Sequence, residues 1–264
     1  MDIFNELLGS VPVPKFIKAR QNFPRPKIED IEGTLREELV ASGLLENIKP
    51  GQRIAITAGS RGVANIARII KELVTMVKEQ DAHPFIIPAM GSHGGSNGPG
   101  QKLVLEGMGI TEEFCGCEIL SSMEVVQLDT TEDGLPVYMD KYANEADGII
   151  VMNRIKPHVG FRGPYESGVT KMIAIGLGKQ KGAETCHAAG FGSMAKNLPA
   201  ISSKVIAKKN IVFGIGILEN AYDETYKFVV MDKNEILEKE PALQQESKDM
   251  LPKIMFDKFD VLVI

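Results

Sequence analysis

The sequence contains no tryptophan, three cysteines and no long uninterrupted apolar stretch. Three cysteines in 264 residues, Cys115, Cys117 and Cys186, are too few and too odd in number for a disulfide framework, so we expect a reducing, cytoplasmic setting. No apolar stretch approaches the roughly 18 residues that a membrane span needs. The N-terminus carries acidic residues instead of a basic region, so we expect neither a signal peptide nor membrane association.

A basic block is also missing, and the formal net charge is −5. This balance argues against a general nucleic-acid binder. The composition, 44% hydrophobic and 25% charged, is that of a globular protein and excludes wholesale disorder and collagen-like repeats. A length of 264 residues allows one large domain or two modest ones, and it suffices to bury a sizeable core.

Short β-rich segments alternate with helical patterns along the chain. Apolar runs predict strands at 53–57, 85–87, 148–152, 211–217 and 228–231. Apolar residues at helical spacing predict helices over 63–78, 101–107, 194–208 and 234–250. This alternation predicts an α/β, Rossmann-like fold, with a mainly parallel sheet and helices on both faces. Residues 124–138, with an Asp133-Gly134 turn, predict a small β-hairpin insertion, and residues 259–264 predict a buried terminal strand.

Three loops follow predicted strands at their carboxyl ends, where ligands bind in open α/β sheets. In the first, residues 57–62, glycines allow close backbone approach and Arg61 offers a forked cation for phosphate or carboxylate. Taken alone, an ordinary turn with a surface arginine is the simpler interpretation. The loop matches neither a Walker motif nor a dinucleotide fingerprint.

The second loop, residues 91–100, combines five glycines with His93, a side chain that exchanges protons near neutral pH. The third, residues 153–163, brings Arg154, Lys156 and Arg162 together with His158, which favours an anionic ligand. Flexible, solvated loops are the alternative interpretation of both segments.

Lys171 lies in a nearly apolar stretch, where burial would depress its pKa and leave an amine for covalent chemistry. It could equally extend to water from a helix surface. His187 follows Cys186 directly, so their side chains should diverge and a joint metal site is not expected. The residues alone thus predict an anion-binding α/β domain with histidines and a lysine at its rim, and they leave the reaction open.

Four landmarks occur in chain order: Gly91-Ser92-His93, Pro157-His158, Ser167-Gly168-Val169-Thr170-Lys171 and His187. Together they resemble the lactate racemase family over about residues 55 to 190. The most specific match is the spacing between Lys171 and His187. The resemblance implies a 2-hydroxy acid racemase or epimerase that works by hydride removal and return through a nickel pincer nucleotide.

The resemblance also implies roles for single residues. Lys171 would attach the cofactor, and His187 would ligate nickel. His93 and His158 would act as alternate acid/base groups on the two sides of the substrate. The segment at Ser60 and Arg61 would bind cofactor phosphate or substrate.

A small anionic 2-hydroxy acid would need a cation for its carboxylate, such as Arg61, Arg154 or Lys156. Cofactor-synthesis enzymes would be required as partners. Where the family carries an aspartate before the arginine, this chain has Ala58-Gly59-Ser60, which leaves the identity of the hydroxy acid open.

The family's second, C-terminal domain has no counterpart in the sequence, so residues 1–264 are expected to form the cofactor-bearing N-terminal domain. Two alternatives stay open. The chain could be a non-catalytic nucleotide- or anion-binding module, or a subunit that needs a second domain for activity.

Overall fold

The structure, a computed structural model, describes residues 2–12, 15–188 and 190–263. Its contacts divide the chain into two units: Pro24–Pro252, and the chain ends Met1–Phe23 with Lys253–Ile264. The unit of the chain ends contains one short helix, α1 (Asp2–Leu8). Within it, the Gln21 side-chain amide donates to the Lys253 carbonyl at 2.8 Å and accepts from the Met255 N–H at 2.7 Å.

The prediction of a buried terminal strand over 259–264 is wrong for the described residues. Residues 259–263 form no strand, and Val261 is 77% exposed; Ile264 lies outside the described residues. A single β-rich segment forms a strand only when a neighbouring strand satisfies its backbone groups. Among the described residues of this unit no strand pairs with it.

The larger unit is built on a five-stranded sheet in the order β2-β1-β5-β6-β7. The first four strands run parallel and β7 is antiparallel to β6. The bounds are β1 (Arg53–Ala58), β2 (His83–Pro88), β5 (Gly148–Arg154), β6 (Ile211–Glu219) and β7 (Thr225–Met231). The predicted mainly parallel α/β sheet is confirmed.

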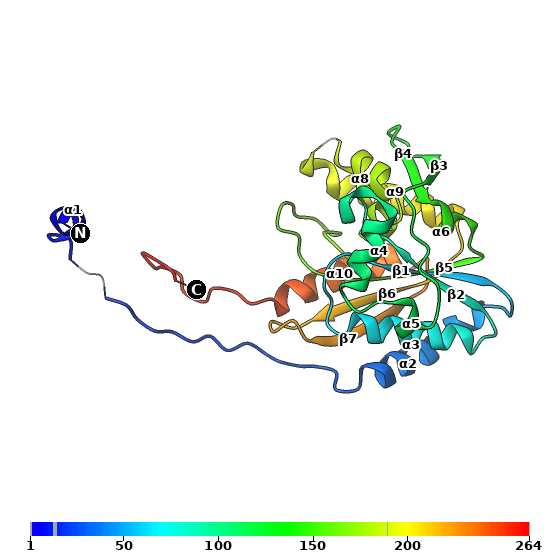
Figure 1. The fold of residues 1–264 in the computed structure, drawn as a ribbon, viewed down its shortest axis with the longest axis horizontal. Helices are drawn as coiled ribbons and strands as arrows, with labels where there is room; N and C mark the ends of the chain where they lie inside the picture. Colours follow the sequence, from blue (N-terminus) through cyan, green and yellow to red (C-terminus); the bar gives the residue numbers. More distant parts are fainter. Residues whose placement is uncertain (1, 13–14, 189, 264) are drawn as a thin grey trace. The chain divides into compact units, whose positions relative to one another are not determined.

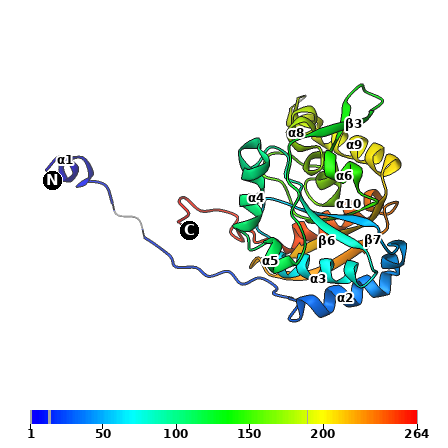
Figure 2. The same cartoon turned by 45° about the vertical axis from the view of Figure 1, so that its right-hand side comes forward.

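Helices cover both faces of this sheet, as Figures 1 and 2 show. Alternate strand residues point to opposite faces, so Ile54 and Ile56 pack in one core and Ala55 in the other. The first core includes α2 (Ile31–Ser42) and α3 (Ile66–Lys78). The second includes α8 (Lys179–His187), α9 (Met194–Lys208) and α10 (Ile236–Met250).

The predicted hairpin is also confirmed: β3 (Val125–Thr130) pairs antiparallel with β4 (Pro136–Asp140). Shorter elements include α4 (Gly98–Glu106), α5 (Glu112–Cys115), α6 (Lys141–Glu145), α7 (Val169–Lys171), a π-helical turn (Met172–Gly176) and three 3-10 turns (Leu44–Asn47, Gly94–Ser96 and Phe191–Ser193). None of the described helices is long and apolar enough to cross a membrane.

The order of the strands creates a switch point between β1 and β5. From β1 the chain crosses to β2 through α3 on one face, and from β5 it crosses to β6 through α7, α8 and α9 on the other. The loops after β1 and β5 therefore diverge and leave a crevice at the carboxyl ends of the strands. Ligands of open α/β sheets bind in such crevices.

Candidate active site

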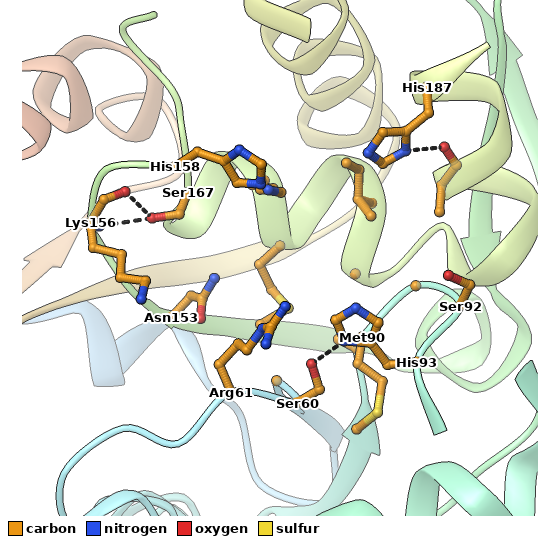
Figure 3. A pocket seen from close by; sticks show the side chains of 18 of the residues that line it. Ser60, Arg61, Met90, Ser92, His93, Asn153, Lys156, His158, Ser167 and His187 are labelled. Atoms are coloured by element: carbon orange, nitrogen blue, oxygen red, sulfur yellow. Dashed lines mark hydrogen bonds between the residues drawn. The ribbon is translucent and has the colours of Figure 1, made fainter. Parts of the chain in front are cut away.

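A cavity of ≈ 470 Å³ lies at this crevice. The loops after β1, β2 and β5 line it together with the segment from α7 to α8 (Figure 3). Seven of the eight sequence-predicted site residues line it: Ser60, Arg61, His93, Lys156, His158, Lys171 and His187. The fold thus brings together side chains that are up to 127 positions apart (187 − 60) in the sequence.

Arg154 is the predicted residue that the structure does not bring to the cavity. Its guanidinium pairs with the Glu219 carboxylate, and Asp223 lies 3.9 Å away. Neighbouring residues of a strand point to opposite sides, so Asn153 lines the cavity and Arg154 does not. The expectation that Arg154 binds the substrate carboxylate is corrected here: the described structure already gives this cation a buried anionic partner.

His93 enters from the loop after β2 and is hydrogen-bonded through Nδ1 to the Ser60 hydroxyl from the loop after β1. Burial lowers the His93 pKa, and the nearby cations Arg61 and Lys171 lower it further. The imidazole is therefore neutral at neutral pH. A hydroxyl can donate or accept, so the Ser60 contact orients the ring and is compatible with either tautomer.

His158 enters from the loop after β5. Burial lowers its pKa, followed by the charge of Lys171. Its Nδ1 accepts a hydrogen bond from the Gly160 N–H at 3.0 Å. Since the neutral ring carries a single proton, that proton belongs on Nε2, and the ring offers a donor there.

A buried carboxylate shapes the loop around His158. Glu166 accepts from the N–H groups of His158 at 2.8 Å and Gly163 at 3.1 Å, and it pairs with Lys248 at 2.6 Å. These hydrogen bonds and the Lys248 charge outweigh burial, so the Glu166 pKa lies below its usual value. The sequence analysis did not single out Glu166. A lone acidic residue in a glycine-rich loop was the only signal.

Lys171 ends α7, and its ammonium lies 5.5 Å from the centroid of the Phe161 ring. Burial lowers the Lys171 pKa and Arg61 adds to this effect, whereas Cys186 opposes it. The depressed pKa increases the fraction of neutral, nucleophilic amine.

His187 is the last residue of α8 and faces the cavity, whereas Cys186 beside it is fully buried. The His187 Nδ1 lies 2.6 Å from the Ala183 carbonyl oxygen one turn back, so it is protonated and donates. The Nε2 lone pair is therefore free for a metal, an orientation that backbone carbonyls commonly impose on ligating histidines. Within the described ranges no group of three or more His, Cys, Asp or Glu side chains could hold a metal alone.

The charge of the cavity has one sign. Arg61, Lys156 and Lys171 line it, and no aspartate or glutamate is among the described residues that do so. Burial and the neighbouring Arg154 lower the Lys156 pKa. The Lys156 backbone is tied to Ser167, whose hydroxyl accepts from its N–H at 2.7 Å. This arrangement suits an anionic ligand.

Comparisons with known proteins bear on the family and the fold of this chain. A family model described as the lactate racemase N-terminal domain matches residues 10–198. The chain belongs to this family. Its fold resembles the solved structure of the lactate racemase apoprotein from Thermoanaerobacterium thermosaccharolyticum, with a TM-score of 0.60 and 15% sequence identity. The superposition covers 84% of this chain and 57% of that one, so the chain spans less than two thirds of that protein's length. No curated protein sequence matched this chain.

The structure shows one more residue beside the site that the sequence analysis missed. Glu240 on α10 is fully buried and accepts from the Thr170 N–H at 2.9 Å and the Thr170 hydroxyl at 3.1 Å, beside Lys171. Burial raises the Glu240 pKa to about 8. Gly168 (φ 104°) is required here, because a Cβ would lie 2.5 Å from the Glu240 Oε1. A glutamate in a distant amphipathic helix gives no sequence signal for this contact.

Proposed function

We propose that this chain is the cofactor-bearing part of a racemase or epimerase of a 2-hydroxy acid, with a nickel pincer nucleotide attached to Lys171. The observation that carries the proposal is the convergence of a lysine of depressed pKa, a histidine with a free Nε2 and two neutral histidines on one cationic cavity. Family membership supports the racemase class.

The residues present fit such a cofactor. Lys171 offers the amine for a covalent link, and His187 offers a single imidazole nitrogen to nickel. A lone histidine is a poor metal site, so the other donor atoms would have to come from the cofactor. When bound, the cofactor would supply the hydride acceptor that amino-acid side chains lack.

His93 and His158 would remove the hydroxyl proton of the substrate and return it. Both rings are neutral at neutral pH because their pKa values are lowered. His93 can accept the proton on Nε2 in the tautomer whose Nδ1–H donates to the Ser60 hydroxyl, and His158 presents a proton on Nε2. From one enantiomer His93 would take the hydroxyl proton, and the imidazolium formed would return it to the substrate oxygen. From the other enantiomer His158 would do the same, in the tautomer that leaves its Nε2 lone pair free. Two enantiomers need such a pair.

Arg61 and Lys156 would hold the substrate carboxylate or the cofactor phosphate. Both line the cavity. A forked guanidinium binds a carboxylate through two hydrogen bonds and so fixes the plane of the substrate.

The test is the intact mass of the protein after co-expression with the cofactor-synthesis enzymes. We expect an adduct and bound nickel in the wild type and in Lys208→Ala, which changes an exposed lysine outside the cavity lining, and neither adduct nor nickel in Lys171→Ala. His187→Ala should keep the adduct and lose most of the nickel. An unmodified wild-type lysine would contradict the proposal. If the cavity then bound only phosphate or a nucleotide, a non-catalytic anion-binding module would be the better description.

A further inference from the structure

One cluster of fully buried polar side chains outside the cavity lining consists of Gln101 on α4, Asp140 at the end of β4, and Lys179 at the start of α8. Each is 0% exposed. Lys179 also adopts a left-handed backbone conformation, with φ 54°. Burying an ammonium costs free energy unless each of its protons has an acceptor.

The Lys179 ammonium has three protons and meets three oxygen atoms. It donates to the Pro88 carbonyl at 2.6 Å and to the Gln101 Oε1 at 2.7 Å, and the Asp140 Oδ2 lies 3.3 Å away. Pro88 is the last residue of β2, immediately before the loop that carries His93. One ammonium thus joins α8 to the end of β2, to α4 and to the hairpin.

The contact with Lys179 also decides how the Gln101 amide is oriented. Because Oε1 accepts from the ammonium, Nε2 faces the other way and donates to the carbonyls of Gly91 at 2.9 Å and His93 at 3.1 Å. The loop lies so close to α4 that a Cβ on Gly94 (φ 66°) would be 2.7 Å from the Gln101 backbone nitrogen. A chain of hydrogen bonds therefore runs from α8 to the His93 backbone.

We propose that Lys179, acting through the Gln101 amide, is a positioning residue that holds the His93 imidazole at the cavity. Neither side chain lines the cavity, so neither is catalytic. Lys179 is also the first residue of α8, the helix that ends at His187. This one buried side chain therefore connects the His93 loop to the helix that carries His187. The role of His93 as a base rests on the proposed function. The positioning of its loop does not.

Gln101→Glu is the decisive variant. It is isosteric and keeps an oxygen for Lys179, but it places a carboxylate oxygen against the two loop carbonyls. We expect amide hydrogen exchange over residues 91–96 to accelerate about tenfold or more. In the uncharged variant Gln101→Met we also expect the His93 pKa, followed by NMR, to rise toward its usual value as the ring moves away from the cavity and from Arg61 and Lys171. In Gln101→Glu the new carboxylate would raise this pKa by its own charge.

Asn210→Asp is the matched control, since the Asn210 amide also donates to a backbone carbonyl, that of Asp147 at 2.8 Å, at the amino ends of β5 and β6. It should leave both measurements unchanged. Exchange over residues 155–168 serves as the internal reference. If Gln101→Glu does not fold, Gln101→Met removes the same two donors without adding charge and is expected to behave alike.

Wild-type exchange and an unchanged His93 pKa in a folded Gln101 variant would overturn the proposal. Equal acceleration in the loops 91–96 and 155–168 would also overturn it, because that result indicates a general loss of stability. Neither measurement needs cofactor or substrate. A missing adduct on Lys171 would therefore remove the proposed function and leave this inference standing.

Discussion

The two histidine loops at the cavity are held by buried charges of opposite sign. Behind the His93 loop an ammonium, that of Lys179, faces carbonyl oxygens directly and through Gln101. Inside the His158 loop a carboxylate, that of Glu166, faces backbone N–H groups. Both loops leave their backbone groups outside regular structure, where they need other partners. The sign of each buried charge follows from which groups, carbonyl or N–H, point inward.

The comparison predicts that the cationic support is the more sensitive to loss. Lys179→Met should leave Asp140 buried without a counter-charge and should destabilise the protein by about 3–5 kcal/mol. Urea denaturation followed by circular dichroism would measure this. Lys208→Met, which removes a lysine that is 55% exposed and 3.7 Å from Asp129, is the control and should change stability by less than about 1 kcal/mol. A loss of stability equally small in Lys179→Met would contradict the prediction that the cationic support is the more sensitive one.

Glu166→Gln should have a smaller effect, because the amide oxygen can still accept one backbone hydrogen bond. We expect a loss of about 1–3 kcal/mol and faster amide exchange confined to residues 155–168. Acceleration in the loop 91–96 would show that the two supports are coupled instead of separate. Glu235→Gln, at an exposed ion pair with Lys239, provides the control.

The two buried glutamate side chains near the site should respond to pH in opposite directions. The Glu166 pKa is lowered, so its stabilisation is present above the pKa of the unfolded chain and is lost as the pH falls through the folded value. The Glu240 pKa is raised to about 8, so its stabilisation is present at acid pH and is lost as the pH rises from the usual glutamate range through 8.

Glu240→Gln should therefore flatten the decline in melting temperature between pH 5 and pH 8, by about 2–4 °C for each ~1 kcal/mol of pH-dependent stability that the substitution removes. Thermal melts of both proteins across this range are the measurement. Glu166→Gln should instead change the slope only at acid pH. An identical slope in wild type and Glu240→Gln would contradict the raised pKa of this carboxyl.

Ser60→Ala should have the smallest effect, the loss of one hydrogen bond to His93. We expect a fall of about tenfold or less in the rate of racemisation by the cofactor-loaded enzyme, or ~1 kcal/mol, with unchanged nickel content. Polarimetry with a set of 2-hydroxy acids would follow the reaction. Loss of nickel in this variant would mean that Ser60 supports the cofactor instead of the His93 ring.

Much of the framework was predictable from the sequence. Apolar runs such as 53–57 and 148–152 bury both of their faces, so their composition alone marks them as strands of a covered parallel sheet. The glycine-rich loop around His93 was also recognisable from its local composition, five glycines in residues 91–100. The terminal run 259–263 has the same composition and forms no strand, because strand formation also needs a neighbour.

What the sequence determined by itself were the features that depend on local composition: the α/β alternation, the loops that hold the histidines, and the lysine in an apolar stretch. Only the tertiary structure decided which charges are already paired. It paired Arg154 with Glu219. It also buried Lys179 against Gln101 and Glu240 against Thr170. These pairings join residues dozens of positions apart. Their free energy depends on distance and burial, which no local pattern encodes.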